Sequence, residues 1–156
     1  MAFNLLDFKK SYENLAKKYK LPSFEEMNAD FEIDKIDKET DLVLRQVRKT
    51  MMDKVVNSMQ FLDMLLNPVN APRMYLVFTQ TMAQSDREII DRMYGRFASL
   101  IVLSLDLEVD WSERGEADLI LNIAKSWKET KPDFKKLLDR IKKPASFAKR
   151  ERLYSG

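Results

Sequence analysis

Residues 38–66 form a long stretch of this sequence that contains neither Gly nor Pro and has a clear helical pattern. Apolar side chains recur there every three or four positions, the spacing at which they share one face of an α-helix. These positions are Leu44, Val47, Met51, Val55, Met59, Leu62, Leu65 and Leu66. Such a helix would span about 40 Å at 1.5 Å per residue. The fold must accommodate this one long element.

The rest of the chain also favours an all-α fold. Only 3 Gly and 5 Pro occur among 156 residues, which leaves little turn chemistry for a many-stranded sheet. We expect a single compact helical bundle of five to seven helices over residues 1–143, followed by a basic, flexible tail over residues 144–156. We expect its two longest helices, roughly 38–66 and 86–108, to pack antiparallel at a shallow angle.

The N-terminal part of the chain shows where its first helices begin and end. Leu5, Phe8, Tyr12, Leu15 and Tyr19 form an apolar stripe, and Pro22 ends that helix because proline disfavours the α conformation of the preceding residue. Ser23 followed by Glu26 has the pattern of a capping box, which predicts a short helix over 23–33.

Similar signals place the later helices. Ser85 with Glu88 is a second capping-box pattern, and Ser112 or a nearby residue starts a further helix. Residues 74–82 are compatible with a helix or a strand, and we choose a helix because no partner strand is evident elsewhere. Pro132 is predicted to open a final short helix that ends at Pro144.

Two features of the segment after Ser85 predict how it packs. Gly95 lowers helix stability by up to roughly 1 kcal/mol relative to Ala, which suggests close packing against another helix. The run LIVLSLDLEVDW, residues 100–111, is apolar on more than one face. We expect this run to lie deep in the core.

The absence of two residue types excludes much chemistry. The sequence has no His and no Cys. Zinc, copper and non-haem iron sites nearly always use imidazole or thiolate ligands, so we expect none of them. Cysteine nucleophiles, Ser-His-Asp triads and helical di-iron sites are excluded for the same reason. Catalysis would have to use carboxylates, Lys, Tyr or carboxylate-bound Mg²⁺.

Carboxylate clusters are therefore the remaining candidates for a metal site. Glu113 with Glu116 is one candidate pair, and Glu25 and Glu26 with Asp30 form another. Such spacings arise by chance in a chain with 25 acidic residues, and no Gly-rich phosphate loop accompanies them. The alternation of Asp106, Glu108 and Asp110 resembles a calcium-binding loop. It has Trp111 where Gly is needed and Ala117 where a bidentate Glu is needed. We expect no metal and no cofactor.

Charge is distributed unevenly along the chain. Residues 25–41 hold eight acidic and two basic residues, whereas residues 131–156 hold nine basic and three acidic residues. These segments either attract each other, within one chain or between two copies, or face different partners. For the acidic arm the candidate partner-binding residues are Phe24, Glu25, Glu26, Asp30 and Phe31. For the basic end the candidates for nucleic acid or an acidic partner are Lys135, Lys136, Arg140, Lys142, Lys143, Lys149, Arg150 and Arg152.

These patterns support three functions in order of preference. The first is a non-enzymatic adaptor or assembly protein that binds another protein or a second copy of itself. The second is association with nucleic acid or the ribosome through the basic end, where Phe147 and Tyr154 could stack on bases. The third is a Mg²⁺-dependent enzyme built on carboxylates alone. Met51, Met52, Met59 and Met64 either fill the core or serve an interface, and we favour the core.

The N-terminus and the apolar runs indicate where the protein resides. MAFNLLDFKKSYENL has no basic region before its apolar residues, so we expect that it is not a signal peptide. The longest nearly charge-free stretch, Met74–Gln84, is shorter than the roughly 20 residues that cross a membrane. We expect a soluble cytoplasmic protein with no membrane association and no small-molecule ligand.

The stretch LPSFEEMNADFEI, followed by an Arg-rich long helix that ends at LLNP, resembles small all-helical proteins of archaea that carry no assigned function. The resemblance covers residues 12–68 and, more loosely, the later helices. It implies an intracellular helical domain and supplies no site residues.

Overall fold

The long apolar stripe is buried along helix α3 (Val43–Leu66). The computed structural model describes residues 5–36, 42–80 and 82–142, so positions 38–41 of the expected helix lie outside the described residues. The 24 residues of α3 span about 36 Å. Val47, Met51 and Val55 have no exposed surface, so this helix runs through the middle of the core.

The described residues contain α-helices and two short 3-10 helices and no strand, which confirms the all-α fold. The elements beside α3 are α1 (Leu5–Tyr19), α2 (Phe24–Phe31), η1 (Ile33–Lys35), η2 (Pro68–Asn70), α4 (Met74–Thr79), α5 (Gln84–Val109) and α6 (Glu113–Ile141). The choice of a helix within 74–82 is confirmed by α4. None of the helices in the described part of the chain is long and apolar enough to cross a membrane. The expected tail over residues 144–156 lies outside the described residues.

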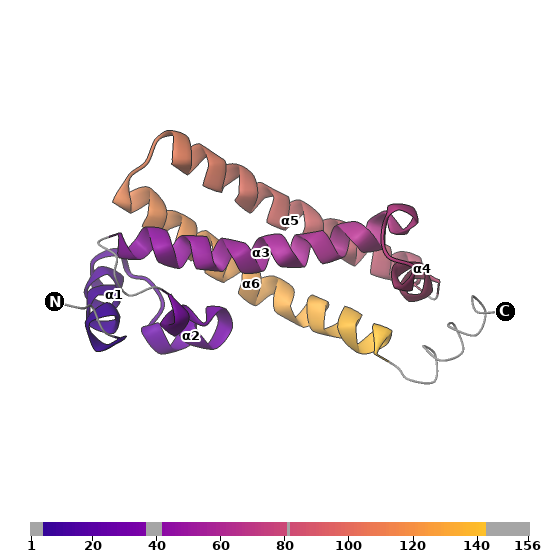
Figure 1. Cartoon of the computed structure of the whole chain (residues 1–156), viewed down its shortest axis with the longest axis horizontal. Coiled ribbons are helices and arrows are strands. Elements are labelled where there is room, and N and C mark those ends of the chain that lie inside the picture. The colour runs from indigo at the N-terminus through magenta and orange to yellow at the C-terminus, as the bar shows by residue number, and fades with distance from the viewer. Residues whose placement is uncertain (1–4, 37–41, 81, 143–156) are drawn as a thin grey trace.

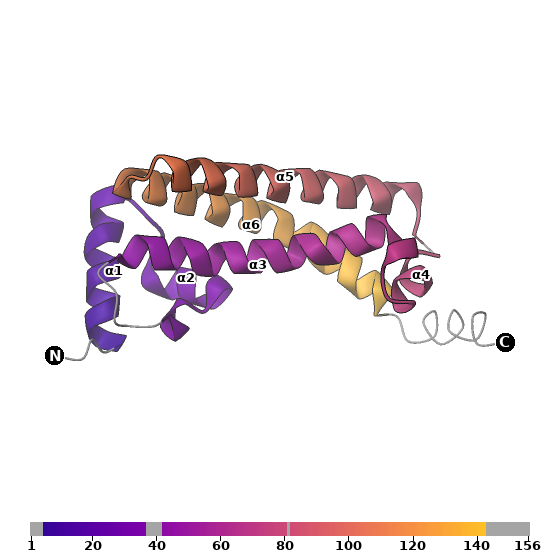
Figure 2. The same ribbon diagram turned by 45° about the horizontal axis from the view of Figure 1, so that its top comes forward.

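Helices α3, α5 and α6 pack pairwise against one another and form the centre of the molecule. Figure 1 shows α5 running antiparallel to α3, as expected, and α6 running back in the direction of α3. Helices α1 and α2 cover one end of this three-helix layer, and α4 packs at the other end (Figure 2). One expectation was wrong: the longest helix is α6, with 29 residues, because it does not end before Pro132.

One hydrophobic core connects all six α-helices. The rings of Phe8 and Tyr12 on α1 meet the edge of the Phe24 ring at centroid distances of 6.3 and 6.0 Å. Trp127 on α6 stacks on Phe97 of α5 at 6.2 Å and lies 6.0 Å from Phe31 of α2. These aromatic contacts fix the small helices on the long ones. The four methionines of α3 are buried or half-buried against this core, as we favoured: Met51, Met52, Met59 and Met64.

The caps of the helices follow the sequence signals in two places and depart from them in one. Ser23 Oγ accepts the Glu26 backbone N–H at 3.2 Å, and Ser112 Oγ accepts the Gly115 N–H at 2.9 Å. The prediction that Ser85 caps a helix was wrong, because α5 begins at Gln84 and its N-cap residue is Ala83. There Asp86 caps instead, and its carboxylate accepts the Ala83 N–H at 3.0 Å.

The prediction that Pro132 opens a separate helix was also wrong, since α6 continues through it. Pro132 cannot donate to the Lys128 carbonyl, but both residues are exposed, so water can reach that group. Trp127, Leu137 and Ile141 are buried on the same face before and after the proline. Burial of this continuous apolar stripe outweighs one lost hydrogen bond.

The run at residues 100–111 is not deep in the core, contrary to expectation. Leu100 and Leu107 are buried against the neighbouring helices, but α5 is covered on one side only. On the outer side the exposed fractions are 63% for Val102, 62% for Leu105 and 88% for Val109. The apolar residues on one face of α5 are therefore buried in the core, and those on the other face are exposed.

Gly95 does not mark close packing within the molecule, which corrects another expectation. A Cβ added at Gly95 would find no atom within 4 Å. The tight glycine is Gly115, where a Cβ would lie 2.5 Å from Leu107 Cδ1 and 2.9 Å from Ser112 Oγ. The first turn of α6 is therefore crowded at Gly115 by the ends of two side chains, whereas the fold of one chain gives no reason for Gly95.

Candidate functional site

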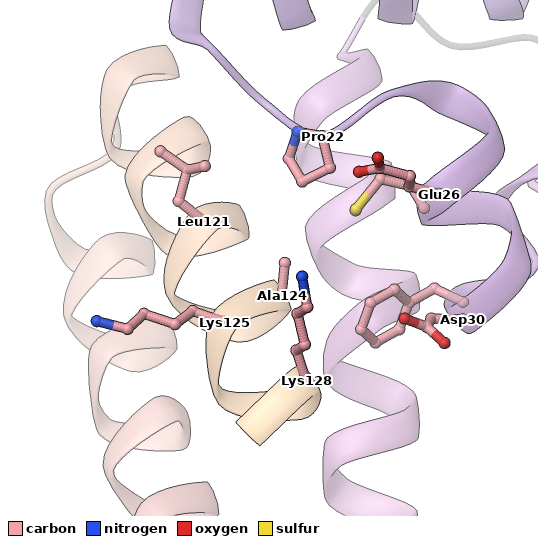
Figure 3. A pocket seen from close by; sticks show the side chains of 9 residues that line it. Pro22, Glu26, Asp30, Leu121, Ala124, Lys125 and Lys128 are labelled. Carbon is pink, nitrogen blue, oxygen red and sulfur yellow. The ribbon is translucent and has the colours of Figure 1, made fainter. Parts of the chain in front are cut away.

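A groove of about 290 Å³ lies between α2 and α6 (Figure 3). Both helices contribute apolar residues to its floor and charged residues to its rims. The lining residues are Pro22, Glu26, Met27, Asp30, Phe31, Leu121, Ala124, Lys125 and Lys128.

The floor of the groove is apolar and open at its centre. Met27 and Phe31 are almost fully buried beneath it on the α2 side. Leu121 and Ala124 face it from α6 (Figure 3), and Leu121 is 36% exposed. Because Ala124 has only a methyl group, the space above it is free for a larger apolar side chain from outside.

The two rims carry opposite charges. Glu26 and Asp30 project from α2, whereas on α6 Lys128 points into the groove and the Lys125 side chain extends away from α2 (Figure 3). The Asp30 carboxylate accepts a hydrogen bond from Lys131 Nζ at 2.9 Å, so this acid is already neutralised within the molecule. Within the described part of the chain, Glu26, Lys125 and Lys128 have no ion-pair partner. The groove therefore offers one free cation, Lys128, on the α6 side and one free anion, Glu26, on the α2 side, and Lys125 adds positive charge on the outer side of α6.

Lys54 of α3 holds the end of α2 in place beneath the groove. Its Nζ donates to the Asp30 carbonyl oxygen and lies 5.5 Å from the Phe31 ring and 4.6 Å from the Trp127 ring. Burial lowers the pKa of Lys54, and the nearby Asp30 charge opposes this shift while the Lys131 charge adds to it. Cation–π contacts and a backbone hydrogen bond thus fix the end of α2 against α3 and α6.

The two aromatic residues of the expected acidic arm do not face outward. Phe24 is 6% and Phe31 is 5% exposed, so both rings pack on the core instead of projecting outward as expected, and only Phe31 borders the groove. Phe24 packs against Phe8 and Tyr12, and Phe31 packs against Trp127. The alternation of acidic and aromatic residues in this segment reflects an amphipathic helix packed on the core.

The acidic residues of the arm separate into two groups. Glu25 pairs with Lys9 Nζ of α1 at 2.7 Å, and this hydrogen bond lowers the pKa of Glu25. Glu26 and Asp30 lie at the groove, so the structure brings two of the expected site residues together with Phe31. The three candidate carboxylates, Glu25, Glu26 and Asp30, therefore lie at two separate places. Glu25 and Asp30 are in ion pairs, and Glu26 is not.

Sequence reasoning missed the residues that α6 contributes to the groove. Leu121, Ala124, Lys125 and Lys128 recur at spacings of three and four, which places them on one side of the helix. This helical spacing was the sequence feature that could have indicated a shared surface. Nothing in it indicated that α2, about 100 residues earlier in the chain, would lie opposite.

The basic end extends this surface along α6. Residues 125–142 carry seven basic and three acidic residues. Lys135 and Lys142 share Asp139 at 3.0 and 3.1 Å, and Arg140 pairs with the buried Asp86 of α5. Lys136 is exposed. The remaining candidates, Lys143, Lys149, Arg150 and Arg152, lie outside the described residues.

Glu113 and Glu116 do not form a metal-binding pair. Glu116 is fully buried and accepts bidentate hydrogen bonds from Arg48 at 2.8 and 2.9 Å, and another from Trp111 Nε1 at 2.9 Å. Glu113 instead accepts the Tyr19 hydroxyl at 2.6 Å. No group of three or more acidic residues within 5–36, 42–80 and 82–142 is placed to hold a metal ion.

Comparison of the chain with protein-family models, with curated proteins and with solved structures found no match. The resemblance to archaeal helical proteins therefore stays a prediction, and function has to be inferred from the site itself.

Proposed function

We propose that this protein is a non-enzymatic adaptor that binds an acidic segment of a partner protein in the groove between α2 and α6. The observation that carries the proposal is the apolar floor at Ala124, bordered by Lys125 and Lys128 and continued by the basic surface of α6. An apolar side chain of the partner fills the space above Ala124. An acidic residue beside it pairs with Lys128, and further acidic residues follow the positive charge of α6.

The physical properties of the groove fit this mode of binding. Binding energy in protein interfaces concentrates in a few apolar anchors that enter pockets, and the groove has room for one or two such side chains. The surrounding charges accelerate association and select an acidic partner. Because Lys54 and the Asp30–Lys131 pair already fix both walls, little conformational entropy is lost on binding.

Nucleic-acid or ribosome association through α6 is the second candidate. It is favoured by the seven basic residues between positions 125 and 142. The two functions differ in their response to salt. Nucleic-acid binding weakens steeply with salt because it releases counterions, whereas an apolar anchor keeps most of its affinity.

The test is affinity capture of the tagged protein from cells of its source, with nuclease and with washes at low and high salt. Two groove variants are compared with the wild type. Ala124→Phe fills the floor without a change of charge, and Lys125→Glu with Lys128→Glu reverses one rim. The charge-matched control is Lys10→Glu with Lys49→Glu, which reverses two exposed lysines away from the groove.

The adaptor proposal predicts that the same protein partner survives nuclease with the wild type and with the control, and is lost with both groove variants. If the captured material disappears on nuclease treatment, the basic surface binds nucleic acid. If both groove variants retain the partner, the groove is not the binding site and the proposal is wrong.

A further inference from the structure

The outer face of α5 carries an exposed apolar seam. Ala98, Val102, Leu105 and Val109 follow one another at spacings of four, three and four, the repeat by which paired helices contact each other. Val102, Leu105 and Val109 are more than 60% exposed. Figure 2 shows α5 along one edge of the molecule over its whole length, with no other helix outside it.

We propose that two copies of this chain pair through the seam, with α5 of one copy antiparallel to α5 of the other. The two-fold axis passes at the level of Leu103 and Ser104. Val102 then faces Leu105 of the second copy, and Ala98 faces Val109 of the second copy. Each contact occurs twice, as a two-fold axis requires.

The sizes of the side chains fit this register. Ala98, the smallest residue of the seam, lies opposite Val109, the most exposed large residue. Gly95 lies at the level of the turn that follows α5 in the second copy, where Trp111 is 41% exposed. The open space around Gly95, which its own chain does not use, accommodates that turn. This packing explains why a glycine, which lowers helix stability, stands at position 95 on the outside of α5.

The charges favour the antiparallel orientation over the parallel one. Asp106, Glu108 and Asp110 gather at the C-terminal end of α5. Antiparallel pairing in this register places them opposite residues 97–101, which carry no charge. Parallel pairing would set the three acids against their own copies, and like charges at such distances repel.

This pairing uses neither the acidic arm nor the basic end, unlike the self-association through opposite charges that the sequence suggested. In both views α2 and α5 lie on opposite sides of α3 and α6 (Figures 1 and 2). The groove of each copy therefore stays open in the dimer. Two grooves in one particle increase the avidity for a partner that presents two binding segments.

The first test is the solution mass of the full chain, by light scattering or sedimentation equilibrium over a roughly 100-fold range of concentration. We expect a species with twice the chain mass of 18.4 kDa. Val102→Glu places like charges beside the axis and raises the dissociation constant of the dimer by at least about 100-fold. The matched control is Val69→Glu, because Val69 is 84% exposed and lies far along the chain in η2, so this variant stays dimeric. Circular dichroism verifies that both variants fold.

A monomeric wild type, or a Val102→Glu variant that remains dimeric, overturns the proposal. The second test fixes the register, using the fact that the chain has no Cys. An oxidised mixture of Ala98→Cys chains and Val109→Cys chains should form mixed disulfide dimers. If each variant cross-links efficiently only with itself, the helices pair in parallel and the antiparallel register is wrong.

Discussion

At the scale of single residues, Arg48 and Glu116 form the most buried ion pair among the described residues. Arg48 also donates to Ser104 Oγ and to the Glu108 carboxylate, so it connects α3 with α5 and α6. The hydrogen bonds with Glu116 and, to a smaller extent, with Glu108 raise the pKa of Arg48, and the bond from Arg48 lowers the pKa of Glu108. Removal of the arginine would take away both charge-assisted hydrogen bonds of the buried Glu116 carboxylate, which would keep the Trp111 N–H and the more distant Arg45 Nε at 3.7 Å.

We therefore predict that Arg48→Ala lowers the free energy of unfolding by about 3–5 kcal/mol. The control is Lys35→Ala, which removes the exposed pair with Glu32 and should change stability by less than about 1 kcal/mol. Urea denaturation of both variants measures the difference. Equal, small effects of the two substitutions would show that the buried pair does not hold the bundle together.

Tyr12 makes the stability depend on alkaline pH. Its hydroxyl donates to the Pro22 carbonyl at 2.7 Å, and burial, with a smaller contribution from Glu26, raises the pKa of Tyr12 above its ordinary value of 10.0. The raised pKa stabilises the fold while the unfolded phenol is still protonated. This stability is lost as the pH rises above about 10, because the unfolded chain then releases the proton first.

The prediction is a comparison of wild type with Tyr12→Phe by urea denaturation between about pH 9 and pH 11. The wild type should lose more stability over this interval than the variant, which has no phenol to ionise. Near neutral pH the variant should be less stable by about 1–2 kcal/mol, because the Pro22 carbonyl loses its donor. Parallel pH profiles for the two proteins would contradict the assigned role of Tyr12.

At the scale of helices, Pro132 interrupts the hydrogen bonds of α6 without ending it. Pro132→Ala restores a donor for the Lys128 carbonyl and removes the clash of the ring with the preceding turn. We predict an increase of about 1–3 kcal/mol in the free energy of unfolding. Lys136→Ala, an exposed substitution one turn later, is the control and should be nearly neutral. A less stable Pro132→Ala protein would mean that the local distortion is needed for packing.

The helices themselves could be predicted because their signals are local. The apolar stripe of α3 and the caps at Ser23 and Ser112 depend on residues a few positions apart. The continuation of α6 through Pro132 could not be predicted in this way, because burial of Trp127 and Leu137 against other helices decides it. The outer face of α5 was missed for a similar reason, since hydropathy alone does not tell which face of a helix has a neighbour.

At the scale of the whole molecule, the separation of charge along the sequence is partly resolved within one chain. Lys131 of the basic end pairs with Asp30 of the acidic arm, although about 100 residues separate them. Glu26 and Asp30 were predicted as site residues, and they do line the groove. Lys125 and Lys128 were not, because their position opposite α2 exists only after α1, α2 and α6 have packed around α3.

The most direct test of the adaptor proposal is hydrogen–deuterium exchange of the protein with and without its captured partner. We predict slower exchange on binding in α2 and in residues 121–128 of α6, because these segments form the two walls of the groove. The protection should disappear in the Ala124→Phe variant at the same partner concentration. Protection confined to α5, or to the basic end beyond residue 131, would contradict the assignment of the groove as the binding site.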